Sequence, residues 1–100
     1  MDIKKMAKIF KALSNPNRLE LYLKIADARE SDFQTSGECF VTDIIDSLNI
    51  GAPTISHHIK ELANADLIIT EKRGKFLTCR VNEQLVAEII KLLTLRQSTK

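Results

Sequence analysis

Residues 41–65, VTDIIDSLNIGAPTISHHIKELANA, constrain the fold of this chain more than any other stretch. Their first apolar side chains recur at helical spacing, at Val41, Ile44, Ile45 and Leu48. Residues 49–51, Asn-Ile-Gly, break the pattern, because Asn and Gly tolerate the left-handed backbone at which helices end. Ala52 and Pro53 begin a second helix, where the missing proline N–H costs no hydrogen bond. The stretch therefore predicts two short helices joined by a tight turn.

The second helix of this pair has one apolar side and one polar side. The apolar side chains expected to face the core are Ile55, Ile59 and Leu62. The polar side chains left to point outward are Thr54, Ser56, His57, Lys60 and Glu61. Helix, short turn and helix form a helix-turn-helix, whose second helix enters the major groove of DNA. The pattern predicts a DNA-contacting surface, with a merely solvated polar side as the alternative.

Three further segments are predicted to be helical. An apolar stripe runs through residues 2–13. Asn15 is a favourable N-cap and Pro16 a favourable first residue for a second helix, which should continue to about Ala28. Residues 83–96 carry the last helical pattern.

A β-hairpin is predicted between the helix-turn-helix and the last helix. Residues 67–71 are rich in β-branched side chains, residues 76–81 alternate in character, and Arg73-Gly74 supplies a turn. In the second strand we expect Leu77, Cys79 and Val81 to face the core and Thr78 and Arg80 to face out. The basic residues near the tip are Lys72, Arg73 and Lys75. Residues 29–38 lack periodicity and predict a loop.

The predicted fold is mainly α with a small β-hairpin, in one domain spanning residues 1–100. Helices, hairpin and terminal helix follow the order of a winged helix-turn-helix. The helix at residues 83–96 has more apolar surface than a small domain covers, so we expect a homodimer through this helix and residues 2–13. The predicted interface residues are Ile3, Met6, Phe10, Val86, Ile89, Ile90 and Leu93. A terminal helix packed across its own core is the alternative.

Charge and hydropathy indicate where in the cell the protein is located and which partners it binds. A net charge of +2 is too small to establish nucleic-acid binding, but basic residues gather at the hairpin tip and at Lys60. No apolar run approaches the roughly 20 residues that span a bilayer. Lysines interrupt the first apolar segment at helical spacing, which is unlike a signal peptide. We therefore expect a cytoplasmic protein without membrane contact.

Three stretches resemble one family of prokaryotic repressors. They are residues 12–19 (ALSNPNRL), residues 53–62 (PTISHHIKEL) and residues 72–75 (KRGK). Together they look like the ArsR (arsenic-repressor) family. The resemblance implies a repressor that binds a palindromic site in double-stranded DNA as a homodimer. Ala52 departs from the family, whose members often carry Gln there, and it can touch a thymine methyl but cannot bond adenine in bidentate fashion.

Roles follow for the predicted DNA-binding residues. Thr54, Ser56 and His57 lie near the start of the second helix, the part that reaches base edges. Lys60 is expected to hold the phosphate backbone. Arg73 and Lys75 are expected to contact the backbone or minor groove, as wings of the family do.

Neither metal site of the family is matched. One uses a Cys-X-Cys pair, and residues 38–44 (ECFVTDI) place Phe40 and Thr42 at its two cysteine positions. Phe cannot ligate, and Thr is a poor ligand for soft metals. The other uses Asp and His on the last helix, and residues 83–96 contain no His. We expect no metal site and no cofactor.

The cysteines and histidines allow weaker alternatives. Cys39 is a candidate redox-reactive thiol, which could pair with its copy in a dimer, whereas Cys79 at an inward strand position is expected to be a core residue. His57 and His58 point about 100° apart on a helix, so they do not form a ligand pair. We expect His57 to face DNA and His58 to be half-buried.

Two other classes of function are alternatives. A winged-helix module that binds another protein is the main alternative, although the polar helix face and basic hairpin favour DNA. An enzyme is not expected, because no Ser/His/Asp set, phosphate-binding loop or carboxylate pair is visible.

Overall fold

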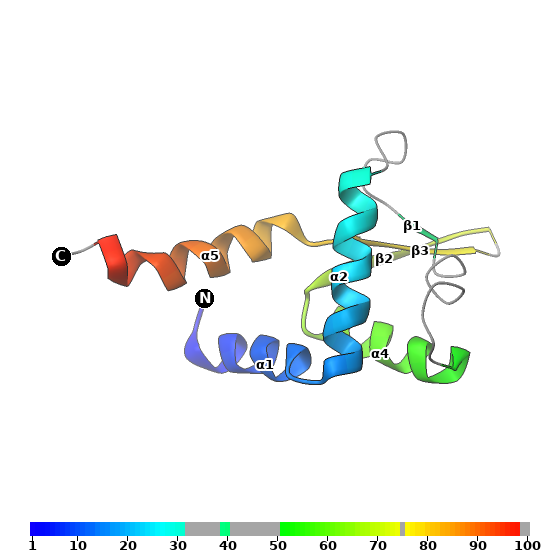
Figure 1. Ribbon diagram of the computed structural model, residues 1–100, viewed down its shortest axis with the longest axis horizontal. Helices are drawn as coiled ribbons and strands as arrows, with labels where there is room; N and C mark the ends of the chain where they lie inside the picture. The colour runs from blue at the N-terminus through cyan, green and yellow to red at the C-terminus, as the bar shows by residue number, and fades with distance from the viewer. Residues whose placement is uncertain (32–38, 41–50, 75, 99–100) are drawn as a thin grey trace.

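The computed structural model describes residues 1–31, 39–40, 51–74 and 76–98 (Figure 1). The helices are α1 (Ile3–Leu13), α2 (Pro16–Ser31), α4 (Ala52–Asn64) and α5 (Glu83–Ser98). The strands are β1 (Cys39–Phe40), β2 (Ile68–Arg73) and β3 (Phe76–Val81). Helix α2 stands across the strands, α1 and α4 lie below it, and α5 leads away from the sheet (Figure 1). The predicted helix at residues 41–48 lies outside the described residues.

Polar side chains begin three of these helices. The Asp2 carboxylate accepts a hydrogen bond from the Lys5 N–H at 2.7 Å at the start of α1, and this helix confirms the prediction for the first segment. Asn15 accepts one at 3.1 Å, as expected for the N-cap of α2. Helix α2 ends at Ser31, so the prediction of a loop at residues 29–31 is wrong. Arg and Glu are good helix formers, and no Gly or Pro follows before Gly37 to end the helix.

The sheet has one strand more than the sequence predicted. Strands β2 and β3 form the expected antiparallel hairpin, and Gly74, with φ 63°, lies at its turn. The two-residue strand β1 pairs antiparallel with β3, which gives the order β1-β3-β2. Strand β3 is therefore central. A two-residue strand is too short to show an alternating pattern in the sequence.

The alternating sequence pattern predicted only in part which side chains of β3 are buried. Cys79 and Val81 are buried and Arg80 is exposed, as expected. Thr78 is buried, against expectation, because β3 is the central strand and its hydroxyl donates to the Glu71 carbonyl at 3.1 Å. Leu77 is exposed instead of buried, because it pairs with Lys72 near the turn of the hairpin, beyond the core.

The core lies where α1, α2 and α4 meet the sheet. Its fully buried large side chains are Ile9, Leu21, Ile25, Ile55, Leu62, Leu67 and Cys79. Ile55, Ile59 and Leu62 all face it, which confirms the predicted inner side of α4. A helix with one side buried in this way is held in a fixed rotation, so its other side has a defined direction.

The turn after α4 contacts both α1 and the start of α5. Asp66 takes the left-handed conformation, φ 63°, which Asp tolerates better than most residues. Its carbonyl accepts a hydrogen bond from the Asn82 amide at 2.9 Å, and its carboxylate lies 3.4 Å from the Lys5 ammonium of α1. Asn82 also caps α5 by accepting from the Leu85 N–H at 3.3 Å. The turn thus joins the end of α4 to the start of α5.

Helix α5 is mostly uncovered beyond its first two turns. Leu85 is buried, and Val86 and Ile89 pack partly against the core. Further along, Ile90 and Leu93 are exposed. None of the described helices combines the length and the apolar character needed to cross a bilayer.

Candidate nucleic-acid interface

The outer side of α4 presents the predicted contact residues to solvent. Thr54, Ser56, His57 and Lys60 are all exposed. Gly51 is the N-cap and, having no side chain, makes no capping bond to the N–H groups of the first turn. Such a helix start favours an anionic oxygen. The structure therefore brings hydroxyl, imidazole, ammonium and helix N-terminus together on one side.

His58 occupies the opposite side of the same helix. It is 6% exposed, so it is more deeply buried than the half-buried position expected. Neither ring nitrogen has a hydrogen-bond partner among the described residues. Burial lowers the pKa of His58, the positive charges of Arg18 and His57 lower it further, and Glu61 opposes them. The ring is therefore held neutral and acts as part of the core.

The predicted wing lies at one end of the sheet. Arg73 ends β2 and is paired in register with Phe76. Lys72 is exposed on the same strand. The structure describes the backbone of Arg73 at the turn, whereas Lys75 lies outside the described residues. The hairpin points away from α5, at the far end of the molecule (Figure 1).

Helices α1 and α5 carry the predicted dimer surface. Ile3 is 84% exposed and Ile90 55% exposed, unusual values for large apolar side chains. A hollow of about 530 Å³ between the helices is lined by Met1, Ile3, Met6, Ala7, Phe10, Leu92 and Leu93. The N-terminal amine lies 3.4 Å from the Glu88 carboxylate of α5. The structure thus gathers Ile3, Met6, Phe10 and Leu93 around one hollow, while Val86 and Ile89 lie closer to the core.

Sequence comparison assigns the family. Residues 33–70 match the family model described as bacterial regulatory protein, arsR family. The chain is 30% identical over 95 residues to an arsenical resistance operon repressor of Staphylococcus aureus, covering 95% of this chain and 83% of the relative. The chain belongs to the ArsR family. Its relatives include the transcriptional repressor SdpR of Bacillus subtilis, 33% identical over 85% of this chain and 84% of that protein.

A solved structure agrees with this ArsR-family assignment at the level of the fold. It is the homodimeric winged helix-turn-helix DNA-binding domain of a possible ArsR-family regulator from Mycobacterium bovis. It superposes with a TM-score of 0.70 at 22% identity, over 96% of this chain and 81% of that one. The fold is therefore a winged helix-turn-helix, and the chain is a transcriptional regulator of the ArsR family.

The structure of the ArsR chain pairs its two cysteines across the sheet. Cys39 lies in β1, directly across from Cys79 in β3. The sequence does not predict this pairing, because the two residues lie 40 positions apart and β1 has only two residues. Among the described residues, no group of three or more His, Cys, Asp or Glu is placed to hold a metal ion.

Proposed function

We propose that this ArsR-family chain represses transcription in the cytoplasm as a homodimer bound to a palindromic site in double-stranded DNA. The observation that supports it best is the exposed polar side of α4, opposite a fully buried apolar side. Because the buried side fixes the rotation of the helix, the polar side can be presented to the major groove as a preformed surface.

The contacts divide into base reading and backbone holding. Ser56, His57 and Thr54 would meet base edges near the start of α4, where hydroxyl and imidazole groups can form hydrogen bonds. Lys60, one turn further on, would contact a phosphate. Arg73 and Lys75 at the wing would contact the adjoining backbone or minor groove. No catalytic residue or metal takes part in this proposal.

Dimerisation follows from the apolar surface on α1 and α5. The exposed side chains of Ile3, Phe10, Ile90 and Leu93 would be buried against a second copy. Met6, Val86 and Ile89 complete the proposed interface. A two-fold dimer doubles every DNA contact and matches a palindrome, and the Mycobacterium bovis neighbour is homodimeric.

Fluorescence anisotropy on the chain's own promoter fragment and on a scrambled duplex, over a salt series, tests this function. Preferential binding to the promoter with a steep salt slope supports the repressor. Equal and feeble binding to both duplexes would contradict it and favour a winged-helix module that binds another protein. In that event a pull-down would follow.

A second candidate function is thiol-based control of the same repressor. The register of β1 on β3 favours it, because Cys39 and Cys79 are partners across the sheet. Oxidation of both thiols by hydrogen peroxide would form one disulfide and two water molecules. Adding the oxidant, then a reductant, to the anisotropy assay shows whether DNA binding responds.

A further inference from the structure

A second basic surface lies beside α4 and is built from three helices. A hollow of about 380 Å³ is lined by Lys8, Lys11 and Ala12 of α1, Arg18 of α2, Glu61 and Asn64 of α4, and Ala65 directly after α4. Three of these side chains are cationic and one is a carboxylate. The hollow therefore carries excess positive charge and favours an anionic partner.

This hollow continues the proposed DNA-contacting side of α4. Ser56, Lys60 and Asn64 follow one another at intervals of four, so they form one column along the helix. The column spans about 12 Å from Ser56 to Asn64, since each residue rises about 1.5 Å. That length is about the width of the major groove, whose far edge is a phosphate backbone. A helix that reads bases at Ser56 thus brings Asn64 and the hollow near that backbone.

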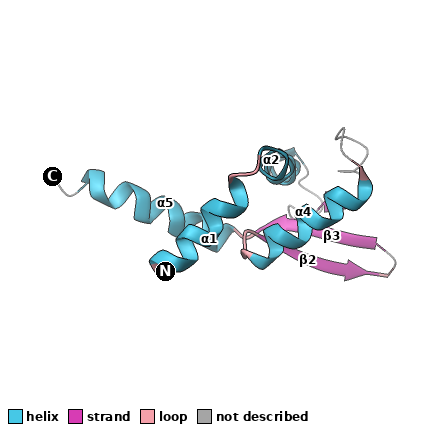
Figure 2. Ribbon diagram, turned by 90° about the horizontal axis from the view of Figure 1, so that it is seen from below, coloured by secondary structure: helices cyan, strands magenta, loops and turns pink. Residues whose placement is uncertain are grey.

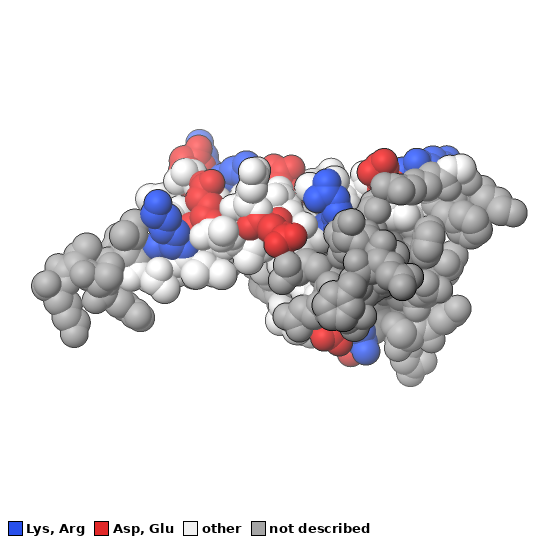
Figure 3. Space-filling view, turned by 90° about the horizontal axis from the view of Figure 1, so that it is seen from above, with Lys and Arg blue, Asp and Glu red and all other residues white. Residues whose placement is uncertain are grey.

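The arrangement of the helices agrees with this position. Seen from below, α1 and α4 lie on the same side of the molecule, with α2 behind them (Figure 2). A flat or gently curved duplex along this side would meet both helices. The opposite side, seen from above, shows acidic and basic side chains intermixed over its described part (Figure 3).

The cations of the hollow are available for a partner. Lys5 is paired with Asp66 at 3.4 Å, but within the described part of the chain Lys8 and Lys11 have no carboxylate within ion-pair distance. The buried Arg18 Nε likewise has no hydrogen-bond partner there. Glu61 is turned toward Asn64, whose amide lies 3.5 Å from its carboxylate. One carboxylate does not neutralise three cations.

We propose that Lys8, Lys11 and Arg18 form a phosphate-binding surface that holds the DNA backbone beside the groove that α4 enters. This inference rests on the proposed function. The surface extends the contacts of each protomer from α4 and the wing to α1 and α2. It would bind phosphate without regard to sequence, because the phosphate backbone is the same for every base pair.

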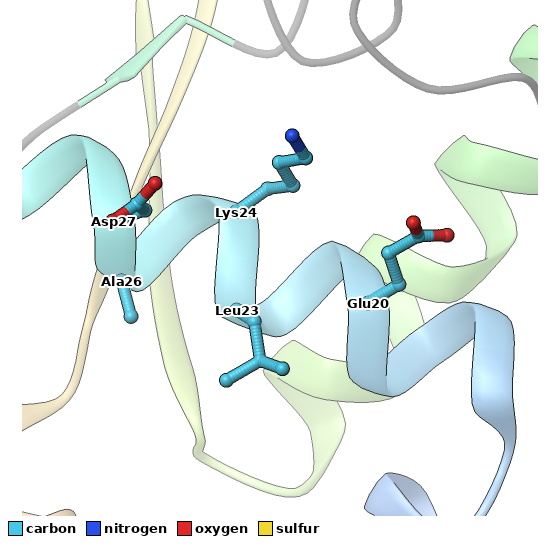
Figure 4. Close-up of a pocket in the computed structure, with 5 residues that line it drawn as sticks. All are labelled: Glu20, Leu23, Lys24, Ala26 and Asp27. Atoms are coloured by element: carbon cyan, nitrogen blue, oxygen red, sulfur yellow. The ribbon is translucent and has the colours of Figure 1, made fainter.

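The test compares alanine and arginine variants at Lys8 and Lys11 with one matched control. Lys24 is the control, because it is an exposed lysine on α2 whose hollow also holds Glu20 and Asp27, and so has no excess positive charge (Figure 4). Each variant is titrated on the promoter fragment and on a scrambled duplex, over a salt series. Thermal melting confirms that each variant folds like the wild type.

Lys8→Ala and Lys11→Ala should each weaken binding to both duplexes by the same factor, roughly threefold to tenfold at moderate salt. Each should reduce the magnitude of the salt slope by about 1.8, since a dimer loses two phosphate contacts at about 0.9 each. Lys8→Arg, Lys11→Arg and Lys24→Ala should keep the wild-type slope.

Three results would overturn the proposal. If both alanine variants keep the wild-type salt slope and the preference for the promoter is intact, this surface does not contact DNA and the proposed function still stands. If inorganic phosphate shifts the NMR signals of Lys8 and Lys11, but neither alanine variant changes DNA binding, the hollow binds a small anion and not the DNA backbone. If the wild-type protein binds neither duplex, the proposed function and the proposal for this surface are both wrong.

Discussion

Cys39 and Cys79 are register partners in the antiparallel pairing of β1 with β3. Directly opposed residues in such a pair have Cβ atoms about 4.5–5.5 Å apart, and a disulfide requires about 3.5–4.5 Å, so the two strands must move together by up to about 1 Å for the bond to form. Cys79 is fully buried in the core, so a large oxidant would not reach it without an opening of the strand. A small oxidant is therefore the appropriate probe.

Hydrogen peroxide should link Cys39 to Cys79 within one chain. Because the bond closes a loop of about 40 residues, it should stabilise the oxidised protein by about 2–4 kcal/mol against unfolding. Peptide mapping by mass spectrometry without reductant identifies the bond, and thermal melting measures the stabilisation. Cys39→Ser should abolish both effects. A covalent dimer on a non-reducing gel would instead place Cys39 against its copy.

Ser56→Ala should relax sequence preference without weakening the fold. Alanine is the better helix former, so the loss is confined to one hydrogen bond to a base of about 0.5–1.5 kcal/mol in each protomer. Because a dimer loses two such bonds, binding to the promoter should fall by roughly fivefold to 150-fold while binding to a scrambled duplex changes little. His57→Ala should act in the same direction. Anisotropy on a panel of single-base operator variants measures the preference.

Lys60→Ala is the contrasting variant for the same helix. It should weaken binding to every duplex by about the same factor and lower the salt slope, since a phosphate contact is independent of sequence. If Ser56→Ala and Lys60→Ala gave the same profile across the operator panel, the division into base reading and backbone holding would be wrong.

The buried ring of His58 should make the fold sensitive to acid. Its pKa is lowered in the native state, so the unfolded chain binds the proton first and stability falls as the pH drops below about 6.5. The stability that the neutral His58 ring contributes is fully present above that pH. His58→Leu, which keeps an apolar group in the core, should flatten this part of the profile. Urea unfolding between pH 5 and pH 7.5 measures it. An equally steep profile in His58→Leu would assign the acid sensitivity to other groups.

Leu93→Glu should convert the dimer to a monomer. A carboxylate on the exposed apolar surface of α5 would have to be buried without a partner in the dimer. Sedimentation equilibrium should show the change, and promoter affinity should fall by at least a hundredfold. Gln84→Glu adds the same charge to an exposed position of α5 and should leave the dimer intact. A dimeric Leu93→Glu would show that the interface lies elsewhere.

Asn82 offers two substitutions that separate its two hydrogen bonds. Asn82→Asp keeps an oxygen for the Leu85 N–H but loses the donor to the Asp66 carbonyl. Asn82→Ala loses both, and should cost about 1–3 kcal/mol of stability against about half of that for Asn82→Asp. Chemical denaturation measures the two costs. Equal costs would show that only the bond to Asp66 contributes.

Local patterns predicted the parts of the fold that depend on neighbours in sequence. The inner side of α4, the hairpin and the Asn15 cap follow from helical spacing, alternation and side-chain chemistry. The exposure of Leu77 and burial of Thr78 do not, because they depend on where the strand ends and on what covers each face.

Contacts between segments far apart in the chain could not be predicted from the sequence. The pairing of Cys39 with Cys79 requires β1, which has only two residues. The hollow of Lys8, Lys11 and Arg18 requires the packing angles of three helices. The spacing of the lysines on α1 is visible in the sequence, but a solvated helix side has the same spacing.

The turn at Asp66 has a consequence for the operator. Its bond to Asn82 fixes the direction in which α5 leaves the domain relative to α4. In the proposed dimer joined through α5, that angle would determine the separation of the two α4 helices, which for a two-fold DNA site is about 34–36 Å, one turn of DNA, or a multiple of it. The number of base pairs between the two half-sites would then be set by this turn, far from the side chains proposed to contact bases.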